Sequence, residues 1–455
     1  MKKSKHPFLK WAGLVFLVLG LVYAGLVVAG NMAVRREKAA LEAAGFPMRP
    51  EQVIPAAIPE EDNAAPLYNA AVKALKEQPR LESEGNDADG GSPNNLLDQL
   101  GRTAVAFLKA PDDAEAAKNF ETLVLDPRVT DFLASFERAS ALPGYRQEND
   151  YSKGAEMSLP HISDNLTVSQ ILAALALQQM RQGNTAAAWR TIEISFRFAD
   201  TLRDEPLLIS QLVRLSQQSI AIKAMKDAAA ISAPSEDVSQ MLQKQLSLFN
   251  GEKSAALALN GERILFSEWA FSQSPVSLGK WMRKFSFGEE VSFPYSSTLA
   301  SVVFGPLLQP WDNAAFLQAS RTMFASGEKA VSESDEGSYV QNIPGLFALT
   351  KYAIPSVQRV RSRLTHAESA ELVARLGLAV INYKREHGVF PRDLQALGAQ
   401  DLVDPFTGKP LVYRPEPNGF LLYSVGPDLT DDGGREYDHK ERKGDIVWRY
   451  VEKAG

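Results

Sequence analysis

The 455-residue sequence contains no cysteine. This absence excludes disulfide bonds, zinc–thiolate sites, iron–sulfur clusters and thiol catalysis. Histidine is scarce as well, and no two histidines have the spacing of an H-E-x-x-H metal motif; the five are His6, His161, His366, His387 and His439. The sequence also lacks the G-x-S-x-G, Walker A and G-x-G-x-x-G motifs. It therefore identifies no catalytic residues and no small-molecule substrate. An active site brought together only by folding is the alternative.

The sequence has no concentrated stripe of basic residues either. Ahead of the first apolar run stand four lysines, and from Arg35 onward 45 basic residues face 55 acidic ones, a net charge of −10. Proteins that bind nucleic acid owe much of their affinity to Lys and Arg side chains that neutralise phosphates. The acidic balance therefore argues against nucleic acid as a partner.

Charge is absent from Trp11 to Val34. A helix of about 20 apolar residues crosses the roughly 30 Å hydrocarbon core of a bilayer, because each residue adds about 1.5 Å. A core helix of a water-soluble protein is rarely apolar on every face for this length. The sequence therefore predicts a single transmembrane anchor over residues 11–33.

The basic segment 1–10 predicts the orientation of this anchor. Positively charged flanks stay on the cytoplasmic side of a bacterial inner membrane, and Lys2, Lys3, Lys5 and Lys10 have no acidic neighbours. We therefore expect a cytoplasmic N-terminus and a body in the periplasm, or otherwise outside the cytoplasm. A cleaved signal peptide is the first alternative, although its apolar region usually has only about 7–15 residues. A reversed orientation is the second.

After the anchor, residues 34–60 read as a linker and residues 61–364 as a helical domain. Arg35–Ala44 continues the anchor as a helix, and four prolines then favour extended backbone. Within the domain, apolar residues recur at helical spacing from about 167 to 232, with a break at Gln182–Asn184. This pattern resembles one tetratricopeptide-type helical hairpin followed by a third helix, and no second copy follows at a 34-residue period.

Three segments of this domain leave functional alternatives open. Glu82–Asn95 and Ser332–Gly337 are acidic, but neither has the ligand pattern of a calcium-binding EF-hand, so solvated loops are the better interpretation. Phe266–Tyr295 is rich in aromatic residues with interleaved basic residues. Such a segment packs over a core or forms a surface for a membrane or a partner, and we favour packing.

The last 91 residues, 365–455, have a different pattern. His366–Glu386 has the periodicity of an amphipathic helix, and Gly388 is placed to end it in a left-handed turn. Apolar and polar residues alternate on both sides of Asn418-Gly419, a pattern that predicts a β-hairpin. Asp445–Trp448 is predicted to supply a third strand. The whole chain is thus predicted to be α+β and predominantly α, with a small antiparallel sheet packed on a helix at its C-terminal end.

This C-terminal segment resembles the globular domain of the major pseudopilin of type II secretion. The resemblance rests on several motifs in the family's order: Tyr383, Gly388–Pro391, Asp404–Pro410, Leu422–Gly426, Asp428, Gly433-Gly434 and Asp445–Trp448. It covers about the last ninety residues. The chain departs from the family in two ways. Its predicted anchor lacks the glutamate that guides pseudopilus assembly, and some three hundred residues separate the anchor from this domain.

The resemblance implies a calcium-stabilised loop. Asp428 stands at the family's first carboxylate ligand and Asp445 in the closing motif, while Gly444 occupies a position where many members carry another aspartate. Asp431 or Asp432 would replace that ligand. Calcium takes about 6–8 oxygen ligands, which a loop of carboxylates and carbonyls can supply. The alternative is that these acids only cap turns and pair with neighbouring basic residues.

Together these features predict a membrane-anchored, non-enzymatic scaffold outside the cytoplasm. Its expected partners are the membrane and other envelope proteins, and its C-terminal domain associates it with a type II secretion or type IV filament-like system. An envelope hydrolase with a noncontiguous active site is the alternative function.

Overall fold

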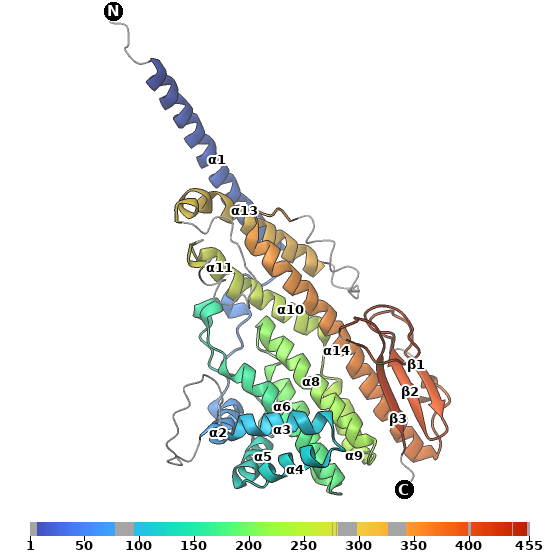
Figure 1. Cartoon of the computed structure of the whole chain (residues 1–455). Helices are drawn as coiled ribbons and strands as arrows, with labels where there is room; N and C mark the ends of the chain where they lie inside the picture. Colours follow the sequence, from blue (N-terminus) through green and yellow to red (C-terminus); the bar gives the residue numbers. More distant parts are fainter. Residues whose placement is uncertain are drawn as a thin grey trace, which may run out of the picture.

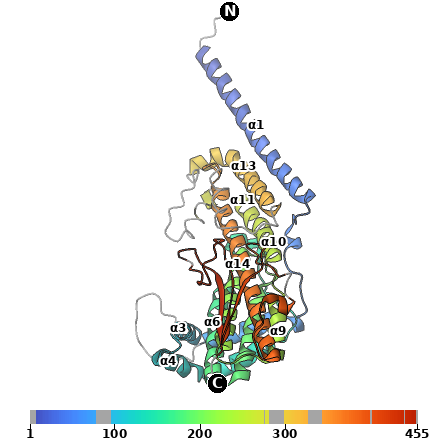
Figure 2. The same cartoon turned by 90° about the vertical axis from the view of Figure 1, so that its right-hand side faces the viewer.

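The computed structural model describes residues 7–77, 95–274, 276–278, 280, 298–325, 343–398, 402–438 and 440–452. The described chain is mostly helical and ends in one three-stranded antiparallel sheet, which confirms the predicted fold class. The N-terminus and the C-terminus lie at opposite ends of the molecule (Figures 1 and 2). The acidic segment Ser332–Gly337, residues 82–94 of the other acidic segment and residues 281–295 of the aromatic segment lie outside the described residues.

The N-terminal helix α1 runs from Pro7 to Ala43 and projects from the rest of the molecule (Figure 1). Its stretch Trp11–Ala43 is long and apolar enough to cross a membrane, and no other helix in the described ranges has this property. None of its most apolar stretch is buried against the protein. The predicted long apolar helix is therefore confirmed, and its insertion in a membrane stays a prediction.

The predicted linker is held against the body. Its first ten residues, 34–43, belong to α1, and a left-handed turn at Gly45 (φ +83°) ends that helix. Short 3-10 helices follow at Pro50–Gln52 (η1) and Glu60–Asp62 (η2). Arg263 donates a hydrogen bond to the Pro47 carbonyl, and Arg146 donates one to the Pro55 carbonyl over 3.1 Å. The prolines thus lie in an extended strap with fixed contacts.

The helical body follows this strap. Its elements are α2 (Ala65–Lys76), α3 (Leu96–Lys109), α4 (Ala114–Val124), α5 (Pro127–Ser140), η3 (Tyr151–Glu156), α6 (Pro160–Arg181), α7 (Thr185–Ala199), η4 (Asp200–Leu202), α8 (Leu208–Ala229), α9 (Glu236–Leu246), α10 (Gly251–Gly261), the π-helix η5 (Glu262–Ser267), α11 (Glu268–Ser272) and α13 (Thr298–Ala325). Helices α6 and α7 form the predicted hairpin, with Gly183 (φ +80°) in its turn, and α8 packs on both. In the described part of the aromatic segment, Trp269 and Phe271 pack in small apolar clusters.

The C-terminal domain is built on α14, a 40-residue helix from Ala348 to His387. Gly388 ends it with φ +73°, as predicted. After η8 (Leu394–Leu397) come β1 (Val412–Glu416), β2 (Gly419–Ser424) and β3 (Ile446–Val451), in the sheet order β1-β2-β3. The predicted hairpin and third strand are confirmed. The boundary expected at residue 365 falls inside α14, so one continuous helix serves both parts of the chain.

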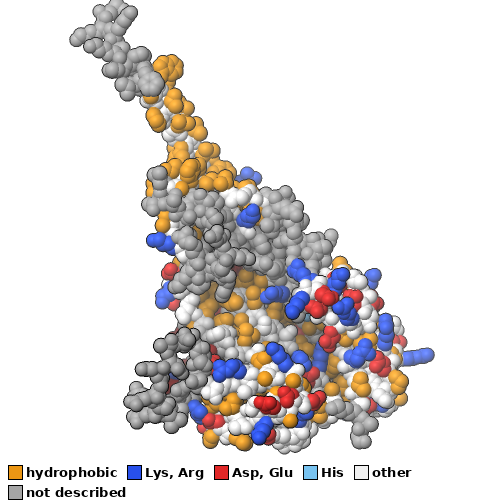
Figure 3. Space-filling model, viewed as in Figure 1, with side chains coloured by type: hydrophobic (Ala, Val, Ile, Leu, Met, Phe, Trp, Pro, Cys, Tyr) orange, Lys and Arg blue, Asp and Glu red, His pale blue; other side chains and the backbone are white. Residues whose placement is uncertain are grey.

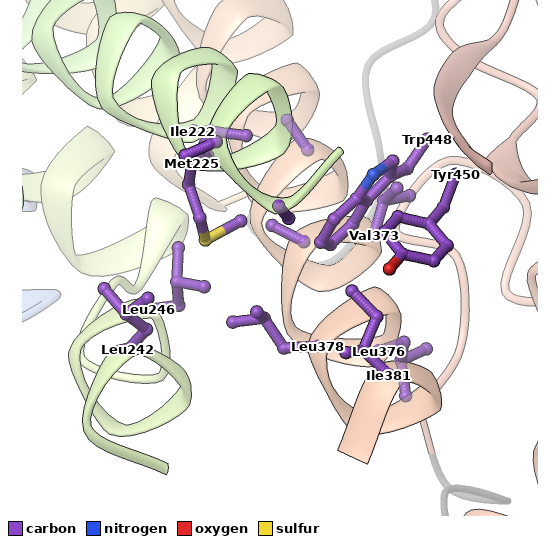
Figure 4. Close-up of a cluster of buried hydrophobic side chains, with 14 of the residues drawn as sticks. Ile222, Met225, Leu242, Leu246, Val373, Leu376, Leu378, Ile381, Trp448 and Tyr450 are labelled. Atoms are coloured by element: carbon purple, nitrogen blue, oxygen red, sulfur yellow. The ribbon is translucent and has the colours of Figure 1, made fainter. Parts of the chain in front are cut away.

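The sheet and the helical body share one hydrophobic core. Buried side chains of α8, α9, α14 and β3 meet in a single cluster, in which Met225 and Leu246 face α14 from one side and Trp448 from the other (Figure 4). Gly377 permits this approach, since a Cβ there would lie 2.1 Å from Cε3 of Trp448. Close packing of this kind fixes the position of one element on the other.

Lys226 of α8 lies at the seam between the body and the sheet. Its ammonium donates to the Val447 carbonyl over 3.0 Å and lies 5.7 Å from the centre of the Trp448 ring. Although part of the residue is accessible, the ammonium is enclosed, and burial lowers its pKa from 10.5 to about 8. The unfolded chain therefore binds this proton more tightly than the folded protein does.

We predict that the folded protein gains stability from this group as pH rises from about 8 toward 10.5, because only the unfolded state still carries the Lys226 proton there. Replacing Lys226→Met removes this gain. The measurement is the free energy of unfolding by urea across that pH range. Lys223→Met is the control, since Lys223 is an exposed lysine of the same helix and pairs with Asp227, four residues further along α8. Equal pH slopes in wild type and Lys226→Met would contradict the prediction.

Candidate functional site

The candidate site is the loop between β2 and β3, which contains all four predicted aspartates. Its first residue is positioned by Asp404, a buried residue at the start of the Asp-Pro motif. Asp404 accepts hydrogen bonds from the Ser424 hydroxyl (2.9 Å) and from the backbone N–H groups of Phe406 (3.0 Å) and Val425 (3.3 Å). The Asp404–Pro410 motif is visible in the sequence, but the sequence alone predicts no role for Asp404. Its role is to fix the end of β2, where the loop begins.

Asp428 and Asp445 close the loop. One Asp428 oxygen accepts the Thr430 N–H (3.1 Å), and the other accepts the Gly444 N–H (3.3 Å). Buried Asp445 accepts the N–H groups of Asp432 (3.3 Å) and Gly434 (2.7 Å). The Thr430 bond is local, and the other three bonds tie the first half of the loop to its end.

Asp431 and Asp432 lie between these closing contacts. Asp431 accepts hydrogen bonds from the Gly433 N–H (2.9 Å) and the Tyr423 hydroxyl (2.8 Å), and these bonds lower its pKa. Oδ2 of Asp432 is buried and has no hydrogen-bond partner. A buried carboxylate oxygen without a partner is costly, so this atom is the feature of the loop that most needs a cation.

The four carboxylates concentrate negative charge around Asp445. Burial raises the pKa of Asp445, the N–H groups of Gly434 and Asp432 lower it, and the charges of Asp431 and Asp432 raise it further. In the folded protein, burial and repulsion both disfavour the ionised form of this group. A bound cation would offset that repulsion.

The fit to calcium is partial. Oδ2 of Asp432 is free to act as a ligand, but both oxygens of Asp428 and Asp445 accept backbone N–H groups. Within the described ranges, no three His, Asp or Glu side chains are grouped so that they could hold a metal ion. To bind calcium, the loop would have to exchange some of these N–H bonds for bonds to the metal.

A second place of interest is a cavity of about 340 Å³ in the helical body, lined by residues of α2, α6 and α7 that include Lys76, His161, Asp164 and Asn165. Its charged groups have partners. His161 Nε2 lies 3.3 Å from the carboxylate of buried Glu205, which also accepts a hydrogen bond from Asn149, and Lys76 pairs with Asp164. The Lys76 pair joins α2 to α6, and the contacts of Glu205 join α6 to the segments before η3 and α8. None of these contacts leaves a carboxylate pointing unpaired into the cavity.

Comparisons of the chain with protein-family models, with curated proteins and with solved structures find no match.

Gly444 gives this loop a property that the resemblance alone does not indicate. Its φ is +112°, and a Cβ there would lie 2.6 Å from the Glu436 carbonyl oxygen. We predict that Gly444→Asp, which introduces the aspartate that many major pseudopilins carry at the corresponding position, destabilises the protein by about 3 kcal/mol through backbone strain and overlap. The measurement is the free energy of unfolding.

The control is Gly433→Asn, at a position with φ +71° and no atom within 4 Å of an added Cβ. Asparagine tolerates this left-handed conformation, so we expect a loss well below that of Gly444→Asp. A Gly444→Asp variant as stable as the wild-type protein would contradict the prediction.

Proposed function

We propose that the protein is a non-enzymatic scaffold anchored in the bacterial inner membrane, with its body in the periplasm, where it engages other envelope proteins. The single observation that carries the proposal is α1. This helix is long, uncharged from Trp11 to Val34 and unburied along its most apolar stretch, so its transfer from water to lipid is strongly favourable. The basic segment before it supports the cytoplasmic N-terminus.

The C-terminal domain supports a more specific partner. A helix capped by Gly388, an Asp404-centred turn and a three-stranded antiparallel sheet occur in the order of the pseudopilin motifs. We infer that the protein is an accessory of a type II secretion or type IV filament-like system. Crosslinking in cells followed by purification should then recover pseudopilins or the assembly platform. Their repeated absence would refute the secretion role and leave the anchored scaffold in place.

We predict that the full-length protein stays in the membrane pellet after carbonate extraction, and that a C-terminal reporter is active only outside the cytoplasm. The double variant Leu17→Arg, Leu21→Arg should release the protein, because each arginine near the middle of a membrane helix costs about 2.5–3.5 kcal/mol. The control is Leu125→Arg, at an exposed position of the body. An untrimmed wild-type protein that washes free would refute the anchor.

We further propose that the β2–β3 loop binds calcium. Excess calcium should then raise the melting temperature of the full-length protein relative to chelator, because binding to the folded state alone contributes about 2.7 kcal/mol at a hundredfold excess over Kd. Asp432→Asn should abolish this increase, since Oδ2 of Asp432 is the carboxylate oxygen without a partner.

Glu441→Gln is the matched control for calcium. Glu441 lies in the same loop but pairs with Arg435 over 2.8 Å, so the calcium response should persist in this variant. Identical melting curves of the wild-type protein with calcium and with chelator would refute calcium binding. A calcium response that Glu441→Gln loses and Asp432→Asn keeps would move the site elsewhere in the loop.

A further inference from the structure

Helix α13 lies beside the half of α1 that is nearer the body, from Tyr23 to Glu37. The Tyr23 hydroxyl donates to the Val303 carbonyl over 2.8 Å, and Trp311 Nε1 donates to the Leu26 carbonyl over 3.3 Å. Nearer the body, Arg321 pairs with Glu37 over 3.1 Å. The two helices therefore run parallel to each other. The N-terminal half of α13 therefore lies beside the membrane-facing part of the anchor (Figure 1).

The depth of these contacts follows from the geometry of α1. Arg35 is its first charged residue on the side of the body. Leu26 and Tyr23 precede it by nine and twelve residues, which corresponds to about 13 Å and about 18 Å along the helix axis. Both contacts with α13 therefore lie within the uncharged stretch of α1, on the lipid side of Arg35.

The chemistry of α13 changes at the same level. Thr298–Trp311, with the sequence TLASVVFGPLLQPW, has no charged residue. Beyond it come Asp312, which is buried, and Arg321, which pairs with α1 at Glu37. The uncharged half of α13 thus lies beside the uncharged part of the anchor, and its charged half lies beside the charged part.

The uncharged half also exposes apolar side chains. Val302, Val303 and Phe304 are 69%, 43% and 48% exposed. Hydrophobic atoms cover the anchor and reach the level at which it joins the body (Figure 3). Three neighbouring large apolar residues in water would be unfavourable, and such a patch marks contact with lipid or protein. Its continuity with the unburied apolar surface of α1 favours lipid.

We propose that the N-terminal half of α13, Thr298–Trp311, is a second membrane-embedded element. It lies beside α1 in the leaflet nearest the body, and lipid acyl chains cover Val302, Val303 and Phe304. Its helical backbone suits this environment because it satisfies most of its own hydrogen bonds. The proposal rests on the anchored scaffold described above and adds a second contact, which fixes the orientation of the body on the membrane.

The absence of cysteine makes a direct test possible, because a single introduced cysteine takes up a spin label without competition. Three full-length variants, Val302→Cys, Leu17→Cys and Leu125→Cys, are labelled and reconstituted in phosphatidylcholine–phosphatidylglycerol nanodiscs. All three positions are exposed on the protein. The measurement is the accessibility of each label to oxygen, which concentrates in lipid, and to a water-soluble nickel chelate.

We expect the label at Val302 to resemble that at Leu17, with high oxygen and low nickel accessibility, and the label at Leu125 to show the reverse. If Leu17 reports lipid while Val302 reports water, α13 is outside the membrane and the inference fails, although the anchor stands. If Leu17 itself reports water, the anchored scaffold fails as well. If Val302 is shielded from both reagents, a protein chain covers the patch and the lipid contact is refuted.

Discussion

Asp312 joins the part of the chain beside the anchor to the part that carries the sheet. It is buried in α13, and its carboxylate accepts the backbone N–H groups of Leu349 and Thr350, each over 3.0 Å, and the Thr350 hydroxyl over 2.6 Å. These are the unpaired donors at the start of α14, where the helix dipole favours a negative charge. Burial raises the pKa of Asp312, and the three hydrogen bonds lower it. Asp312 therefore fixes the start of α14 beside α13, while the core shared with α8 and α9 fixes the half of α14 that carries the sheet.

The features predictable from the sequence are those with local causes. The anchor follows from the absence of charge between Trp11 and Val34, which requires no knowledge of the rest of the chain. Gly388 could be assigned because a helix that stops needs a left-handed residue, and the hairpin because Asn418-Gly419 suits a tight turn. In the candidate site, the four aspartates were assigned through the resemblance to pseudopilins, and their position between β2 and β3 follows from the predicted strands. Each of these signals lies within a few residues of the feature it predicts.

The remaining features depend on contacts between distant residues. Pro355 lies inside α14, where a proline normally predicts a helix end, so the sequence did not indicate one helix from Ala348 to His387. Pro306 and Pro310 lie inside α13 in the same way, so the sequence did not predict this helix, which packs on α1. In the loop, the sequence could not show that Asp428 and Asp445 accept backbone N–H groups from the far end of the same loop. Those bonds exist only once Gly426, Gly434 and Gly444 have taken positive φ angles.

The contacts between these elements limit how far the body can move relative to α1. A flexible tether over residues 34–60 would let the body sample many heights above the membrane. Here Arg263 and Arg146 hold that segment, Arg321 holds α13 to α1, and Asp312 holds α14 to α13. Gly377, where the sheet packs, lies about 44 Å along α14 from its start. If α1 is embedded in a bilayer as proposed, a partner that recognises the sheet would meet it at a set distance from the membrane, which suits the proposed scaffold role.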